Sequence, residues 1–151
     1  DYDFENKIIT LKGKYQSFKN SKIKIESSKV IKFNDMTKKA YSQGSVKLSL
    51  ENSIKIISNE LEAKFTKIDN DIIDAKATGE VKILTKLETI LCNSAKFENS
   101  KGIISLTGNV QIKKGDSIIT GEEGLVNLKT GKSKIFSKKS KRVKGVFSPS
   151  K

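Results

Sequence analysis

The stretch that decides the fold is Gly108-Asn109-Val110-Gln111-Ile112, in which a glycine precedes a regular alternation of apolar and polar residues. Successive side chains of a β-strand point to opposite faces, so this alternation indicates a strand with one buried and one wet face. Short runs with the same alternation occur along the chain, and no window shows the apolar stripe of a helix. The sequence therefore predicts an all-β protein.

The pattern around Gly108 is repeated. Closely similar stretches begin at Gly44 and Gly79, a weaker one begins at Gly13, and Gly145 ends the series. Within each unit a second motif places a small or amide residue two positions after an apolar one; it starts at Ile25, Ile57, Leu91 and Ile119. Each unit should hold three or four strands of ordinary length, and stacking of the units should bury one continuous core.

Turn-forming residues separate the alternating runs. They lie at Glu51-Asn52, Asp69 to Asp71, Asn99 to Gly102, Lys114 to Asp116 and Lys129 to Lys132. Lys64 to Asp74 accordingly reads as a strand, a turn and a strand. We expect a single domain over residues 1–151, built of repeated antiparallel hairpins as an elongated sandwich or open barrel, with a free strand edge at each end.

The composition limits the kind of core and the class of partner that the chain can have. The 35% hydrophobic fraction suits a thin core or a core with one open side, and Lys and Arg outnumber Asp and Glu by 30 to 17. A net charge of +13 attracts anionic partners such as nucleic acid, anionic lipid or acidic glycans. Lysines on wet strand faces, where they also protect exposed edges, account for the same charge without any partner.

Several kinds of chemistry find no support. The chain has no histidine, and its one cysteine, Cys92, lies in an expected strand and reads as a small buried hydrophobe. Gly131-Lys132-Ser133 lacks the other glycine of a phosphate-binding loop, and carboxylates such as Glu122 lie at turns without ligand spacing. We therefore expect no enzymatic activity, no cofactor and no metal.

Location and the basic run 138–144 stay open at this point. No run of about 18 apolar residues is present and no signal peptide is visible, so the chain is either cytosolic or a mature exported form. The basic run lacks interleaved aromatic residues, which disfavours nucleic acid as a partner. One interpretation of the run is a solvated loop. The other is a binding segment that contacts either lipid phosphate or an acidic strand edge of a partner protein.

Longer motifs carry a resemblance to a known family. Residues 104–121, with Leu106-Thr107-Gly108-Asn109-Val110 at their centre, look like the core repeat of the LptA/OstA family. Residues 125–132 are also similar, and the segment from Arg142 to Pro149 resembles the C-terminal end of LptA proteins. The likeness covers roughly 24–151, is strongest over 79–149, and departs from the family before Gly44.

The resemblance implies a fold and a role. The family fold is an elongated open β-jellyroll of antiparallel strands, located in the periplasm, with a hydrophobic groove for the acyl chains of lipid A. Family members stack end to end through edge strands and bridge inner- and outer-membrane components of the same fold. For this chain we therefore expect a mature periplasmic protein, its signal peptide removed, that binds lipopolysaccharide and carries it between those components.

The alternation gives the candidate groove residues. They are the apolar residues expected on the inward face, and any one of them could equally be ordinary core: Val46, Leu48, Ile54, Ile56, Leu61, Phe65, Val81, Ile83, Ile90, Phe97, Val110, Ile112, Ile119 and Leu125. Two alternatives remain. One is a sister component of the same pathway resembling LptC, which should carry an upstream membrane helix; the other is a structural β-repeat scaffold that binds no lipid.

Overall fold

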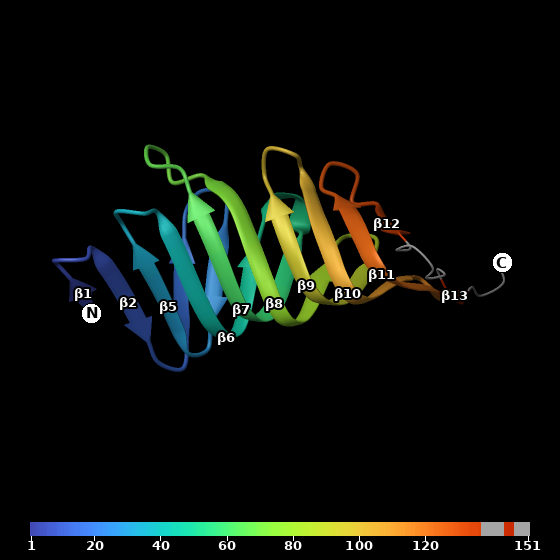
Figure 1. Cartoon of the computed structure of the whole chain (residues 1–151), viewed down its shortest axis with the longest axis horizontal. Coiled ribbons are helices and arrows are strands. Elements are labelled where there is room, and N and C mark those ends of the chain that lie inside the picture. The colour runs from blue at the N-terminus through green and yellow to red at the C-terminus, as the bar shows by residue number, and fades with distance from the viewer. Residues whose placement is uncertain (137–143, 147–151) are drawn as a thin grey trace.

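The computed structural model describes residues 1–136 and 144–146, which form one long antiparallel sheet wound along the axis of the molecule (Figure 1). The main strand order is β1-β2-β5-β6-β7-β8-β9-β10-β11-β12, with β3, β4 and β13 attached to its sides. The elements are β1 (Tyr2–Asp3), β2 (Ile8–Lys12), β3 (Gln16–Lys19), β4 (Lys24–Ser27), β5 (Val30–Asn34), β6 (Lys39–Ser49), the 3₁₀ turn η1 (Glu51–Ser53), β7 (Lys55–Phe65), β8 (Ile72–Leu84), β9 (Thr89–Glu98), β10 (Ile103–Lys114), β11 (Ser117–Asn127), β12 (Ser133–Phe136) and β13 (Lys144–Val146). The all-β, antiparallel prediction is confirmed.

The glycines of the repeat bend the long strands. The ladder register shifts at Gly44-Ser45 in β6, Gly79-Glu80 in β8 and Gly108-Asn109 in β10. In each pair both residues have positive φ, for example 81° at Gly108 and 48° at Asn109. Such a β-bulge places an extra residue opposite its partner strand and bends the bulged strand. The bulges lie on successive alternate strands, so the sheet turns a corner along its whole length.

The second repeat motif lies against this corner. A Cβ atom added to Gly79 would lie 2.8 Å from Nδ2 of Asn59, and one added to Gly108 would lie 2.6 Å from Nδ2 of Asn93. The amide side chain of the unbent strand therefore occupies the space that a side chain on the bulge glycine would need. The two motifs recognised in the sequence are thus the two sides of one structural corner.

The corner divides the sheet into two arms. Arm A consists of β1, β2, β5, β12 and residues 39–43, 60–65, 72–78, 94–98, 103–107 and 123–127. Arm B consists of β3, β4, β13 and residues 46–49, 55–58, 81–84, 89–92, 110–114 and 117–121. Each long strand crosses both arms, so a repeat unit is a hairpin of two bent strands rather than three or four separate ones. The sequence pattern could not reveal this, because alternation continues through a bulge.

The inward faces of the two arms pack against each other. The Phe18 ring in arm B lies 5.5 Å from the Phe33 ring and 5.6 Å from the Phe65 ring, both in arm A. Cross-strand partners continue the inward face of arm B as one apolar row: Phe18, Ile25, Leu48, Ile56, Ile83, Ile90, Ile112 and Ile119. The facing row of arm A has three alanines at its centre and larger side chains on either side: Phe33, Ala40, Ala63, Ala75, Phe97, Ile104 and Val126. The two inward rows thus contribute to one apolar cluster.

The predicted turns join the strands at the ends of the arms. Residues 66–71 connect β7 to β8, which confirms the strand, turn and strand predicted over 64–74. The described sheet ends at β1 and β3 on one side and at β12 and β13 on the other (Figure 1). The basic run 138–144 lies outside the described residues apart from Lys144, which begins β13.

Candidate functional site

The interior between the arms contains nearly all the predicted groove residues. Twelve of them are at most 4% exposed and belong to one apolar cluster: Val46, Leu48, Ile54, Ile56, Leu61, Phe65, Val81, Ile83, Ile90, Phe97, Val110 and Ile112. The cluster draws on strands from β4 to β11, so it runs along the axis of the molecule. The candidate site is therefore an extended apolar interior rather than a local cleft.

Two predicted residues differ from this pattern. Ile119 faces inward, opposite Ile112, but is only half-buried because it lies near the C-terminal end of the interior. Leu125 lies on the outward face, since it stands between buried Gly124 and Val126. Its inward assignment was wrong because the repeat motif was aligned one residue out of step from Ile119 onward: the register matches Ile119 to Ile90, not to Leu91. Val126 occupies the position expected for Leu125.

Other inward residues were missed by the sequence reasoning. The alternation in Ile23-Lys24-Ile25 could have identified Ile25, and the same motif extends to Phe33, both of them buried. The inward alanines carry too weak an apolar signal to be recognised in a pattern. Buried members outside the predicted set include Ile23, Ile25, Ile31, Phe33, Ile72, Ile104, Leu106 and Val126, together with Ala40, Ala63, Ala75, Ala77 and Ala95.

The free ends of the arms meet along a seam opposite the corner. Near its N-terminal end, the Lys22 ammonium in arm B lies 3.1 Å from the Asp71 carboxylate in arm A. Beside this ion pair, the Asn20 amide donates a hydrogen bond of 3.0 Å to the Asn70 carbonyl. Further along, the Ser133 hydroxyl donates to the Glu88 carboxylate. The described seam is thus held by a few polar contacts between side chains at the ends of the arms.

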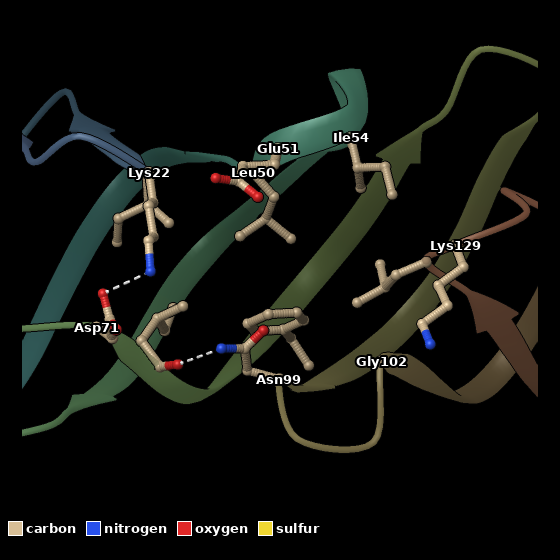
Figure 2. A pocket seen from close by; sticks show the side chains of 12 residues that line it. Lys22, Leu50, Glu51, Ile54, Asp71, Asn99, Gly102 and Lys129 are labelled. Atoms are coloured by element: carbon tan, nitrogen blue, oxygen red, sulfur yellow. Dashed lines mark hydrogen bonds and ion pairs between the residues drawn. The ribbon is translucent and has the colours of Figure 1, made fainter.

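A cavity of about 310 Å³ opens in the seam between these contacts (Figure 2). Its apolar walls include Leu50 and Ile54 from arm B and Phe97 from arm A, while Lys22 and Lys129 lie at its rim. A second hollow of about 310 Å³ continues along the seam past Ile54 to Leu87 and Leu128. The seam therefore gives solvent access to apolar side chains that belong to or pack on the interior cluster.

The electrostatics of the seam favour the closed contact. The Asp71 carboxylate, as hydrogen-bond acceptor and negative charge, raises the pKa of Lys22, and the charges of Glu51 and Asp69 add to this. The charged ammonium is thus stabilised by the Asp71 carboxylate across the seam. Inside the core the neutral form is favoured instead. Burial raises the pKa of Cys92 to about 11, so its thiol stays neutral. Cys92 is buried, as predicted.

The interior between the arms is suited to contact with apolar molecules rather than to catalysis by polar groups. Within residues 1–136, no group of three or more His, Cys, Asp or Glu residues is placed to hold a metal ion. Among the same described residues, no helix is long and apolar enough to cross a membrane. What the interior offers is contact with apolar chains, while lysines and carboxylates at the seam offer contact with polar groups.

A comparison with family models decides the identity. Residues 24–132 match the model of the LptA/(LptD N-terminal domain) LPS transport proteins. The chain belongs to this family. The match covers most of the sequence, including every strand from β4 to β11. The resemblance first noticed around Gly108 is thus confirmed, and the family is one of transport proteins rather than enzymes.

A solved structure supports the fold. The chain resembles LptH, described as the LptA-homologous periplasmic component of the lipopolysaccharide transport device of Pseudomonas aeruginosa. The TM-score is 0.71 at 12% sequence identity, and the match covers 84% of this chain and 95% of LptH. The predicted open jellyroll is therefore confirmed. None of the curated protein sequences compared with the chain matches it.

Proposed function

We propose that this protein binds the acyl chains of lipopolysaccharide between its two arms and carries the lipid across the periplasm. The observation that carries the proposal is the unbroken apolar row of arm B, with one inward side chain on each strand from β3 to β11 apart from β5. Strands lie about 4.8 Å apart, so this row extends along most of the sheet. Membership of the LPS transport family and the periplasmic location of LptH support the same role.

The energetics are consistent with a carrier. Each buried CH₂ group contributes about 0.8 kcal/mol, so several acyl chains provide a large favourable term. Apolar side chains fill the interior, so the arms must separate to admit a lipid. The described seam contacts are an exposed ion pair and part-buried hydrogen bonds, each of which contributes little to stability individually. Separation at the seam therefore costs much less than separation at the continuous corner.

The ends of the sheet are suited to partners of the same fold. At the N-terminal end, arm A extends past arm B by β1 and β2, so the inward residues Ile9 and Leu11 stay 38% and 37% exposed. A partner strand paired with β3 would cover these two side chains and would form hydrogen bonds with the unpaired backbone groups of that edge. We propose that residues 1–151 act as one domain that stacks head to tail and connects inner- and outer-membrane components.

A charge placed at the C-terminal mouth of the interior tests the proposal. Ile119→Asp puts a carboxylate on the inward face, where an acyl chain would have to desolvate it, and Ile119 is only half-buried, so the fold should tolerate the change. We expect lipopolysaccharide binding at least tenfold weaker, measured by titration with the purified lipid. Ile118→Asp, the neighbouring outward position, is the matched control and should bind normally.

Three results would be informative. Weaker binding in Ile119→Asp alone supports an interior lipid site. Equal binding in the wild type and both variants would contradict it. No lipid binding by the wild type would instead favour the scaffold alternative, in which the same fold assembles through its edges without lipid.

A further inference from the structure

The outward face of arm A carries another hollow, separate from the two in the seam. Its volume is about 570 Å³, and its lining extends from β2 across the sheet to β9. Five lysines line it, together with Glu62, Asp74 and Tyr41: Lys32, Lys39, Lys64, Lys76 and Lys96. Lysines outnumber carboxylates in this lining by five to two, so the hollow is positively charged.

The register brings like charges together here. Lys39 lies directly opposite Lys64, and Lys76 lies directly opposite Lys96. On the β7–β8 ladder, Lys64 also lies opposite Asp74 and Lys76 opposite Glu62, so two carboxylates offset part of the repulsion. Like charges at directly opposed positions destabilise a sheet. Among the described residues, no carboxylate lies within ion-pair distance of any of the five lysines, whereas Lys22, Lys24, Lys38 and Lys101 do have such partners.

The outward face of arm B is arranged differently. In its central strands Lys47 and Lys82 both lie opposite Ile57, and Lys55 lies opposite Ser49 and Leu84. The lysine-rich composition by itself therefore does not force lysines into opposed pairs. Arm B has one directly opposed lysine pair, Lys19 and Lys24, at its N-terminal edge, whereas arm A has two such pairs within one hollow.

The hollow lies just behind the rim of the seam cavity. On β9, Phe97 lines the seam cavity and its neighbour Lys96 lines the hollow. On β8, Ile72 lines the seam cavity and Asp74 the hollow, two residues and thus about 7 Å further along the strand. A polar group that emerges from the seam can therefore reach the lysines by passing over the end of arm A.

We propose that this hollow binds the anionic sugar head group of the carried glycolipid, through phosphate or carboxylate groups on the saccharide. The inference rests on the proposed function, because it takes the acyl chains to occupy the interior. An anion among Lys39, Lys64, Lys76 and Lys96 replaces repulsion by charge-assisted hydrogen bonds. Glu62, Asn34 and Thr37 in the same lining supply partners for sugar hydroxyl groups.

The test separates the head group from the acyl chains. The probe is the phosphorylated saccharide left after complete deacylation of lipopolysaccharide, titrated by calorimetry into the full chain at low salt. Lys76→Gln/Lys96→Gln should weaken binding about tenfold, since two exposed charge contacts are lost. Lys47→Gln/Lys82→Gln removes the same charge from arm B and should stay within twofold of the wild type. The first double variant removes the repulsion between Lys76 and Lys96 together with the attraction between Lys76 and Glu62, so it should melt close to the wild type.

An equal loss of binding in both double variants would overturn the proposal, since attraction would then follow net charge alone. Binding of a polyglutamate peptide as tight as that of the saccharide would overturn it too, in favour of an acidic protein partner. Neither result affects the interior site, whose own test uses acylated lipid and inward residues. A failure of the head-group site is thus distinguishable from a failure of the carrier function.

Discussion

Replacing Gly108 with alanine is expected to lower the free energy of unfolding by about 2–4 kcal/mol. The new Cβ would meet the Asn93 side chain at 2.6 to 3.1 Å, and φ at this position is 81°. The bulge can relax only by moving β9 or by straightening β10 at the corner. Either movement weakens the packing of one arm against the other, so the loss should appear in a chemical denaturation experiment.

Gly115→Ala is the matched control for Gly108→Ala. Its φ is also positive, at 58°, but nothing lies within 4 Å of the added Cβ, so only the backbone preference is lost, about 1 kcal/mol. Removing the obstructing side chain with Asn93→Gly should partly rescue Gly108→Ala. Equal losses at Gly108 and Gly115, or no coupling between Gly108 and Asn93, would contradict the role assigned to the corner.

Truncation of Ile83 to alanine should cost about 2–5 kcal/mol. Ile83 is fully buried at the centre of the arm B row, between Ile56 and Ile90, so its removal leaves a cavity that neighbours on two strands must fill. Ile73→Ala on the same strand is the control, because Ile73 faces outward and is 39% exposed. It should cost well under half as much.

The same denaturation experiment decides this comparison. A large loss for Ile83 and a small one for Ile73 would confirm the inward register of β8. Similar losses for the two isoleucines would mean that β8 is packed on both faces, and the division into an inner and an outer surface would then be wrong.

Much of the fold follows from short-range sequence patterns. Alternation at Val46-Lys47-Leu48 and at Val81-Lys82-Ile83 predicts both strand formation and the buried face, because strand geometry alone fixes which residues share a face. Turn residues such as Asp69 to Asp71 gave the hairpin connections for the same local reason. The family resemblance then supplied the overall jellyroll.

What the sequence could not provide depends on register and on long-range packing. Leu125 was placed on the wrong face because a shift of one residue in the repeat alignment exchanges the two faces of a strand. The bulge at Gly108-Asn109 keeps the alternation intact, so the division of each strand between two arms is invisible in the pattern. Lys22 and Asp71 form their ion pair across the seam, a contact that no local spacing encodes.

The lysine cluster on arm A illustrates the same limit. In the sequence, Lys76 and Lys96 are two of many outward lysines and carry no signal of their own. They become a pair only because β8 and β9 align in one particular register. Binding surfaces made of cross-strand neighbours therefore need the structure, whereas an apolar interior can be read from alternation.

The most direct test of the carrier account is site-specific photocrosslinking to lipopolysaccharide in Gram-negative cells that produce this protein. A photoreactive residue is placed in turn at the inward positions Ile56, Ile83 and Ile112, with the outward Lys55 and Lys82 as controls on the strands of Ile56 and Ile83. The account predicts lipid adducts at all three inward positions and none at the controls. Equal labelling of both sets, or adducts at none of them, would contradict an interior path for the lipid.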